Sequence, residues 1–277
     1  PLGVGAWQIA TSPLEFISGE GRVSGALSHP NTFGFYLVVV ILGALALLPS
    51  LQRAGRLGLV ALVGLAAVEL AVTYSRTSYV ALAAGMAVLI VVGRRWALLA
   101  VGVALIALAT LVPGVASRWD DLGQAVTLRG TPANTLTWRL DYWGDVLAAS
   151  EERRVTGLGL GVVAETTEQQ RQPHNDFVRA LAELGIIGLL AYGAFLAALS
   201  GRSYSTLRAT RDPARRNTTS RGLAEGCAAI SSAFLVGSVT GNLMTQLVIL
   251  WYVLGFAVIA GVALRHRPNS LLGREGG

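Results

Sequence analysis

The hydrophobic positions along the chain gather into long blocks that polar residues seldom interrupt. Each block approaches the ~20 residues that a helix needs to cross the hydrocarbon core of a bilayer. The blocks cover residues 34–49, 57–73, 78–92, 96–112, 177–199, 223–240 and 246–264. Glycines within them allow close contact between helices. This pattern predicts an all-α polytopic membrane protein with about seven transmembrane helices and one long, partly helical external loop.

Composition supports this class and excludes others. Of the 277 residues, 53% are hydrophobic and only 14% are charged, whereas a soluble domain carries about 25% charged residues. The single cysteine, Cys227, has no partner for an intrachain disulfide. An ordinary cytosolic enzyme, a disulfide-stabilised secreted module and a disordered tail are therefore excluded. The chain starts at Pro1 without a leader segment, so we expect it to be N-terminally truncated, with further spans before it.

The positions of the 22 basic residues, all arginine, predict an orientation in the membrane. Connections 52–56, 93–95, 200–222 and 265–277 hold 13 of them, and the alternate connections hold eight in many more residues. The positive-inside rule then places the Arg-rich loop 200–222 and the tail 265–277 in the cytoplasm. The N-terminal segment 1–33 and the segment 113–176 are predicted to be external. They flank helices one to four in 34–112, and helices five to seven follow in 177–264.

The net charge of +6 is therefore mainly a topology signal. Arginines next to the bilayer are expected to contact the anionic head groups of membrane lipids. Nucleic acid is not an expected partner, because the basic residues lie in short connections between apolar blocks.

Residues 113–176 form the longest polar segment, and long loops in compact proteins are usually functional. Four apolar residues recur there at helical spacing: Leu136, Leu140, Trp143 and Leu147. They predict a helix from about 135 to 150, with this stripe on the membrane surface or on the helix bundle. Arg139, Tyr142 and Asp145 would lie off the stripe and be available for chemistry.

Ionisable residues beside the membrane are the main candidates for chemistry, because burying them there costs free energy. Arg76 stands in a polar break between two apolar blocks on the predicted outer side. Neighbouring hydroxyls, and Glu69 two turns earlier, would orient its guanidinium toward an anion. The alternative is a simple interfacial anchor. Arg179 and Glu183 are four residues apart, a spacing that favours an ion pair on one helix face.

His174 precedes the fifth apolar block. A neutral imidazole there can take a proton from a hydroxyl group, and the alternative is that residues 172–176 only cap the next helix. The Gly-Leu-Gly-Leu-Gly segment at 157–161 resembles a phosphate-binding loop only loosely, because a lysine and a strand–helix unit are missing. Scattered histidines without paired carboxylates predict no metal site and no cofactor.

Six short pieces in this order resemble the membrane O-antigen ligases and related bacterial polysaccharide polymerases. The pieces are Arg22-Val23-Ser24-Gly25 with His29-Pro30-Asn31; Tyr74-Ser75-Arg76; Arg139 with Trp143; the glycine-rich segment 157–161; His174-Asn175-Asp176-Phe177; and residues 183–188. Members of this family usually have more than seven spans, which agrees with a chain that lacks its beginning.

The resemblance implies a membrane glycosyltransferase of the bacterial inner membrane with a site that faces the periplasm. It would move a glycan from an undecaprenyl-pyrophosphate-linked donor to a hydroxyl group of a lipid or glycan acceptor. The family's functional arginines fall on Arg76 and Arg139, and its histidine falls on His174. Fixed guanidiniums stabilise a leaving pyrophosphate without a metal, and inversion at the sugar carbon is expected.

Further residues are predicted to shape the substrate site: Tyr74, Asp141, Asp145, Arg171 and Arg179. The shared motifs leave open whether the enzyme is a ligase or a polymerase. Two alternatives from other classes are a transporter or flippase of a lipid-linked or anionic solute, and a non-catalytic scaffold for envelope assembly.

Overall fold

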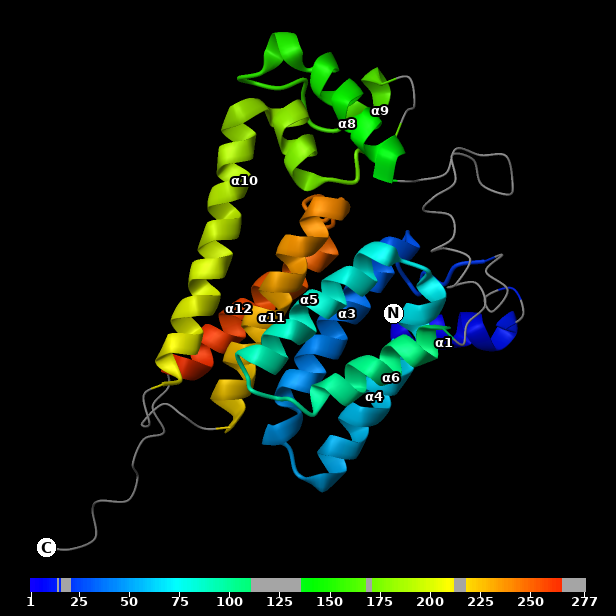
Figure 1. The fold of residues 1–277 in the computed structure, drawn as a ribbon, viewed down its shortest axis with the longest axis vertical. Helices are drawn as coiled ribbons and strands as arrows, with labels where there is room; N and C mark the ends of the chain where they lie inside the picture. The colour runs from blue at the N-terminus through cyan, green and yellow to red at the C-terminus, as the bar shows by residue number, and fades with distance from the viewer. Residues whose placement is uncertain (14, 16–20, 111–135, 168–170, 212–217, 266–277) are drawn as a thin grey trace, which may run out of the picture.

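The computed structural model describes the chain except for residues 14, 16–20, 111–135, 168–170, 212–217 and 266–277. The regular elements of the described part are all helical, which confirms the all-α prediction (Figure 1). They are α1 (Leu2–Thr11), α3 (Pro30–Leu47), α4 (Arg53–Thr73), α5 (Arg76–Val91), α6 (Leu98–Thr110), α8 (Leu136–Ala149), α9 (Val163–Thr166), α10 (Asp176–Ala209), α11 (Thr218–Thr240) and α12 (Leu247–Arg265), with single 3₁₀ turns at Leu48–Ser50 and Glu151–Arg153. Residues 113–135 of the predicted external segment, and residues 266–277 of the predicted tail, lie outside the described residues.

Apolar helices occupy the predicted apolar blocks. Five of them, α3, α4, α10, α11 and α12, are long and apolar enough to cross a membrane, and α5 and α6 are apolar but shorter. The count of seven spans therefore stays a prediction. Helix α10 continues to Ala209, beyond the expected end at residue 199, so Arg202 and Arg208 stand on a helix and the Arg-rich connection is shorter than expected.

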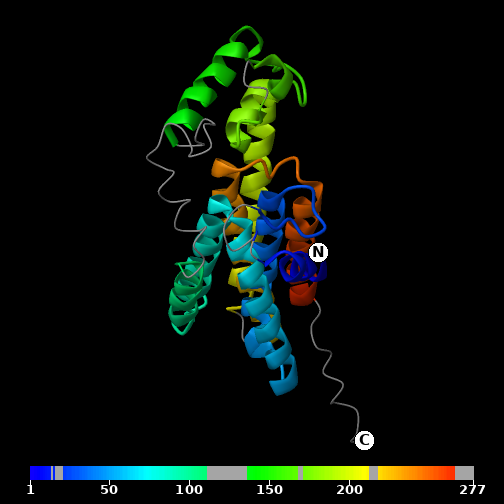
Figure 2. The same ribbon diagram turned by 90° about the vertical axis from the view of Figure 1, so that its right-hand side faces the viewer.

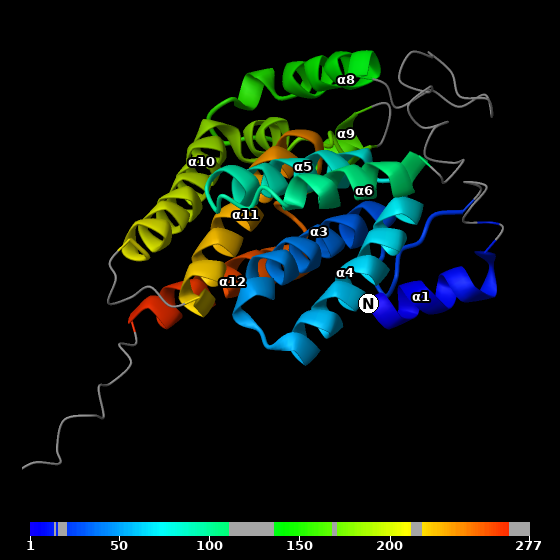
Figure 3. The same cartoon turned by 60° about the horizontal axis from the view of Figure 1, so that its bottom comes forward.

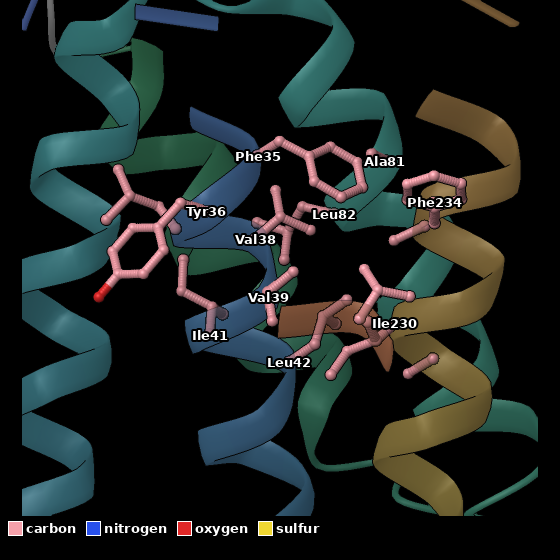
Figure 4. Packing of buried hydrophobic residues seen from close by; sticks show 14 of the residues in the cluster. Phe35, Tyr36, Val38, Val39, Ile41, Leu42, Ala81, Leu82, Ile230 and Phe234 are labelled. Carbon is pink, nitrogen blue, oxygen red and sulfur yellow. The ribbon is translucent and has the colours of Figure 1, made fainter. Parts of the chain in front are cut away.

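Helices α3 and α11 form the centre of the bundle. Helix α11 packs against α5, α10, α3 and α12, and α3 packs against α4 and α5. Phe35 of α3, Leu82 of α5 and Phe234 of α11 interdigitate in this core (Figure 4). A side chain at Gly85 of α5 would collide with Leu42 of α3, so this glycine permits the close packing. Figure 3 shows α1 beside α4, on the side of the bundle away from α10.

Consecutive helices run in opposite directions, so the polar connections between them lie at the two ends of the bundle. At one end the Thr77 hydroxyl donates to the carbonyl oxygen of Thr240 (3.0 Å), which brings the start of α5 to the end of α11. We call this the His174 end. At the opposite end, Arg95 donates to the carbonyl oxygens of Leu45 (2.7 Å) and Ala46 (2.9 Å), at the end of α3. We call this the Glu225 end.

A break in α10 separates its first turns from the long helix that follows. Gly185 has φ 66° and ψ −165°, which are not helical values. The glycine-rich segment packs on this break, where the amides of Leu158 and Gly159 donate to carbonyl oxygens of the first part of α10 (both 2.9 Å). The Ile186 amide donates in return to the Arg154 carbonyl oxygen (2.9 Å). Backbone amide and carbonyl groups that lose their helical partners at the break thus form hydrogen bonds with the glycine-rich segment and with Arg154.

The glycines of this contact have a steric role. A Cβ at Gly185 would collide with the carbonyl group of Val155, and a Cβ at Gly157 would collide with the backbone of Glu183. Both glycines also have φ values in the left-handed region, which other residues rarely adopt. The Gly-Leu-Gly-Leu-Gly segment therefore packs against the α10 backbone.

Helix α8 lies at the His174 end, above the bundle in Figure 2. Its bounds agree with the expected helix, but its buried face differs from the expected one. Tyr142 is only 1% exposed, and its hydroxyl contacts Thr167 (2.8 Å) and the Arg171 carbonyl oxygen. The prediction that Tyr142 is available for chemistry is therefore wrong. Val163 of α9 and residues of α10 cover it, and contacts of this kind are not visible in helical spacing.

Candidate functional site

The turn between α4 and α5 places Arg76 at the His174 end. Tyr74 takes a left-handed conformation (φ 52°) that ends α4. The Ser75 side chain then caps α5 by accepting a hydrogen bond from the Ser78 amide (3.4 Å). Arg76 is therefore the first residue of α5. Tyr74, a predicted substrate-binding residue, is buried in this turn at 4% exposed.

Glu69 does not have the role predicted for it. The position of Gly5 in α1 faces both the Glu69 carboxyl group and the Phe33 ring, and a Cβ at Gly5 would lie 2.9 Å from each. The prediction required residues 69 and 76 to lie on one face of a continuous helix. Helix α4 ends at Thr73, and the chain turns at Tyr74. Glu69 therefore faces α1 instead of orienting Arg76.

Arg139 reaches the same end from α8. Its Nη1 donates to the carbonyl oxygen of Thr240 (3.1 Å), the acceptor that Thr77 also uses. Thr240 ends α11, and the carbonyl groups at a helix C-terminus carry the negative end of the helix dipole. Burial, followed by the charge of neighbouring Arg76, lowers the pKa of Arg139. The charge of Arg76 is therefore felt at Arg139.

The backbone around His174 is held on both sides. His174 has a left-handed φ of 51°, and the preceding Pro173 carbonyl oxygen accepts a hydrogen bond from Trp143 Nε1 of α8 (2.6 Å). The following residue, Asn175, caps α10 by accepting hydrogen bonds from two of its first amides (2.9 and 3.1 Å). His174 Nδ1 lies 3.2 Å from Nδ2 of Asn242, in the connection between α11 and α12. The ring therefore has a fixed place beside this connection.

The electrostatic surroundings of His174 keep it neutral. Burial, followed by the charges of Arg139, His29 and Arg171, lowers the pKa of His174 to about 4. These three groups come from α8, the start of α3 and the segment before α10. The structure thus brings together the three residues predicted to be catalytic, Arg76, Arg139 and His174.

Two residues that sequence reasoning left without a role also lie at this end. His29 caps α3, and its Nδ1 accepts a hydrogen bond from the Asn31 amide (3.0 Å). Arg22 Nε donates to the Thr73 carbonyl oxygen (2.8 Å), and Nη2 donates to Asn31 Oδ1 (2.6 Å). Burial, followed by the charge of Arg22, lowers the pKa of His29. The His29-Pro30-Asn31 piece of the resemblance was the available signal.

The remaining predicted residues of the external segment are more peripheral. Asp141 and Asp145 are exposed on α8. Arg171 is also exposed, and its guanidinium carbon lies 5.7 Å from the centre of the Trp138 ring. Of these three, Arg171 contributes directly to the positive potential at His174.

Arg179 is committed to a structural contact. Its Nε lies 3.0 Å from Glu183 Oε2, which confirms the predicted ion pair. Its Nη1 donates to the Thr245 hydroxyl (3.0 Å), so the pair also ties α10 to the α11–α12 connection. Glu183 is fully buried.

The α11–α12 connection, residues 241–246, is the part of the site with the weakest sequence signal. Asp176 Oδ2 accepts hydrogen bonds from the amides of Leu243 and Met244 (both 3.0 Å) and from the Tyr192 hydroxyl (3.0 Å). A buried aspartate at the start of α10 thus holds this connection in place. The sequence showed only a short polar turn.

The site is suited to an anion. Helices α3, α5, α10 and α12 begin at this end, and helix N-termini favour negative charge. Within the part of the chain that the structure describes, no cluster of three or more His, Cys, Asp or Glu residues is able to hold a metal ion. Arginine and histidine are the groups that this arrangement offers for binding an anion and accepting a proton.

Comparison with protein families gives a match that covers part of the chain. Residues 61–193 match the family model described as O-antigen ligase. The match begins inside α4 and ends inside α10, so it contains Arg76, Arg139 and His174. No curated protein matches the chain in a comparison of full sequences.

Proposed function

Because residues 61–193 belong to the O-antigen ligase family, we propose that this protein transfers a glycan from an undecaprenyl-pyrophosphate-linked donor to an acceptor hydroxyl. The reaction takes place at the outer face of the bacterial inner membrane. The main support for this proposal is that Arg76, Arg139 and His174 all lie at one end of the bundle.

The two arginines act on the leaving group. When the bond between the sugar C1 and the pyrophosphate oxygen breaks, its electron pair stays on the pyrophosphate, which gains negative charge. Arg76 and Arg139 come from two different helices, and the charge of Arg76 acts on Arg139. Both guanidiniums would stabilise the charge on the leaving pyrophosphate through charge-assisted hydrogen bonds. The reaction needs no metal ion in this scheme, because guanidiniums supply the positive charge.

His174 acts on the nucleophile. The acceptor hydroxyl oxygen forms the new bond to C1 on the face opposite the leaving group, and its proton passes to the neutral His174 ring. A single displacement inverts the configuration at C1. A donor pyrophosphate near His174 also opposes the positive field of Arg139, His29 and Arg171, and so makes the ring a better base once the donor is bound.

The orientation in the membrane follows from the distribution of arginine. Arg95 and Arg221 meet Glu225 at the end opposite to His174, and the Arg-rich part of α10 extends toward that end. The positive-inside rule then puts the Glu225 end in the cytoplasm and the His174 end outside. Of the other predicted substrate-binding residues, Asp141, Asp145 and Arg171 are exposed and would surround the glycan and its carrier there. Tyr74 and Arg179 are buried and would act only through the positions of their neighbours.

An in vitro transfer assay tests the proposal. The full-length protein in detergent is given an undecaprenyl-pyrophosphate oligosaccharide, with or without a lipid A–core acceptor. We expect Arg76→Ala, Arg139→Ala and His174→Ala each to reduce product formation by about 10²–10⁴-fold, with normal yield of folded protein. Arg154→Ala, which removes an exposed ion pair with Glu151, is the control and should keep full activity.

The two arms of the assay separate the two open activities. Longer lipid-linked glycans from the donor alone indicate a polymerase, and a product on the lipid A–core indicates a ligase. Full activity of all three alanine variants would contradict the mechanism. Movement of the donor across a vesicle membrane without transfer would favour a flippase instead.

A further inference from the structure

His174 has one ring nitrogen that is already engaged. Nδ1 lies 3.2 Å from the side-chain amide of Asn242, so Nε2 is the nitrogen that remains for a substrate. A neutral imidazole carries its proton on one nitrogen only. The partner of Nδ1 therefore decides whether Nε2 has a lone pair, as a base requires, or an N–H group.

The amide of Asn242 is compatible with both arrangements. Its oxygen and nitrogen exchange places when the amide turns by half a rotation, and the hydrogen-bond network assigns the two atoms. With Nδ2 toward the ring, Asn242 donates to Nδ1 and the ring proton sits on Nε2. In that arrangement Oδ1 of Asn242 is buried and has no hydrogen-bond partner among the described residues, and a buried acceptor without a partner is unfavourable.

Turning the amide gives that oxygen a partner and moves the NH2 group to the position that the oxygen leaves. Asn242 Oδ1 then accepts a hydrogen bond from His174 Nδ1–H, and Nε2 is left with its lone pair. The charged groups that face His174 do not compete for Nδ1 as acceptors, because Arg139 and Arg171 are cations and His29 already uses its own Nδ1 to cap α3.

Hydrogen bonds fix the position of the connection that contains Asn242. The next two residues, Leu243 and Met244, donate their amides to the buried carboxylate of Asp176, which follows His174 by two residues. On the other side, the Thr240 carbonyl oxygen receives both Arg139 and Thr77. The end of α11 and the connection that follows it thus contact the Arg139 guanidinium and the histidine ring, respectively.

We propose that Asn242 is a positioning residue that accepts the Nδ1 proton of His174 and so leaves Nε2 as the proton acceptor. The inference rests on the proposed function, because it assigns a role to the same histidine. Asn242 lies outside residues 61–193, the range of the family match.

The test compares Asn242→Ala with Asn242→Asp in the full-length protein and uses the transfer assay above. Aspartate only accepts hydrogen bonds at neutral pH, so it preserves the proposed contact and alanine removes it. We expect Asn242→Ala to lower kcat by about tenfold or more, with little change in KM for the undecaprenyl-pyrophosphate donor. Asn242→Asp should recover most of kcat. It should also move the acid limb of the pH–rate profile upward by about one pH unit, because a carboxylate favours the imidazolium.

Two controls make the outcome specific. Leu247→Ala changes an exposed side chain at the first residue of α12, directly after this connection, and should leave kcat unchanged. Adding Asn242→Ala to His174→Ala should cause no further loss, since the two act through one ring. Thermal unfolding in detergent reports whether each variant is folded.

Failure of the inference and failure of the proposed function look different. If His174→Ala keeps full activity, the assignment of the base is wrong whatever Asn242 does. If His174→Ala is inactive but Asn242→Ala has a wild-type kcat, only the role of Asn242 is overturned. Equal impairment of Asn242→Ala and Asn242→Asp also overturns it, because an acceptor at Nδ1 would then not be what the ring needs.

Discussion

The two ends of the bundle both contain arginines but hold them by different means. At the Glu225 end, Arg95 and Arg221 form ion pairs with Glu225 at 2.5 and 2.7 Å. The carboxylate is only 3% exposed. Arg95 also donates to carbonyl oxygens of Leu45 and Ala46. A buried carboxylate that is paired in this way offsets one of the two positive charges and fixes the packing of α3, α5 and α11.

At the His174 end, carbonyl oxygens of helix C-termini receive arginine side chains. Arg139 donates to Thr240 at the end of α11, and Arg22 donates to Thr73 at the end of α4. A carbonyl dipole orients a guanidinium but carries no net charge, so the positive field persists. Burial, followed by the charges of neighbouring arginines, lowers the pKa values of His174 and His29. Both groups of arginines lie at a membrane surface, so position alone does not distinguish their roles. The partner does: a carboxylate partner indicates a structural role, and a carbonyl partner leaves the arginine able to bind an anion.

The largest expected difference between the two ends comes from one matched pair of substitutions, Arg139→Ala and Arg95→Ala. We expect Arg139→Ala to reduce transfer by about 10²-fold or more with little effect on thermal unfolding. Arg95→Ala at the other end should lower the free energy of unfolding by about 2 kcal/mol, because Glu225 loses one of its two partners. Activity per folded molecule should then be normal. Transfer assays and thermal unfolding on the same samples check this, and a loss of activity in both variants with normal stability would contradict the division of roles.

The break in α10 affects only the His174 end. Gly185→Ala introduces a Cβ that collides with the Val155 carbonyl group, at a φ that disfavours it. We expect it to displace the segment that carries Arg139 and His174, with a loss of activity and of about 2 kcal/mol or more in the free energy of unfolding. Gly193→Ala, where a Cβ meets open space on the same helix, is the matched control and should be neutral. Equal behaviour of the two variants would show that the break is dispensable.

The pH dependence gives the smallest and most specific effect. The pKa of His174 in the free protein, about 4, lies below its ordinary value of 6.5. The acid limb of kcat/KM, which reports the free enzyme, should therefore lie near that lower value. The limb of kcat should lie higher, because bound pyrophosphate favours the protonated ring. Rate profiles at several donor concentrations measure both, and a kcat/KM limb near 6.5 would contradict the lowered pKa.

The same shift affects stability in a defined direction. His174 stays neutral in the folded protein at a pH where an unfolded chain is already protonated. The stabilising contribution of the buried neutral ring is complete above pH 6.5 and decreases as the pH falls toward 4. Unfolding measurements on wild type and His174→Ala across this range should converge at the acid side.

Several features were predictable from local pattern alone. The apolar blocks gave the helices, and the spacing around Trp143 gave α8 with nearly correct bounds. The order of short motifs predicted the family whose model matches residues 61–193, and the i, i+4 spacing predicted the Arg179–Glu183 pair. These are properties of consecutive residues, which helical geometry and burial in a membrane determine without knowledge of distant contacts.

Other features required the fold. Tyr142 was expected on a free face and is buried, because α9 and α10 cover it. Glu69 was expected beside Arg76 and faces α1, because the chain reverses at Tyr74. The polar connection at 241–246 had no chemical signature, yet it supplies the amide beside His174. Thr240, the residue directly before it, supplies the carbonyl oxygen that accepts a hydrogen bond from Arg139.

The sequence by itself therefore determined the class of protein, the helices and the three residues on which the chemistry is proposed to depend. Only the tertiary structure decided which partners those residues have. Hydrophobicity and helical period act over a few turns of one helix. The electrostatics of a site depend on which helix ends meet, and here the ends of α4 and α11 meet the starts of α3, α5 and α10 from distant parts of the chain.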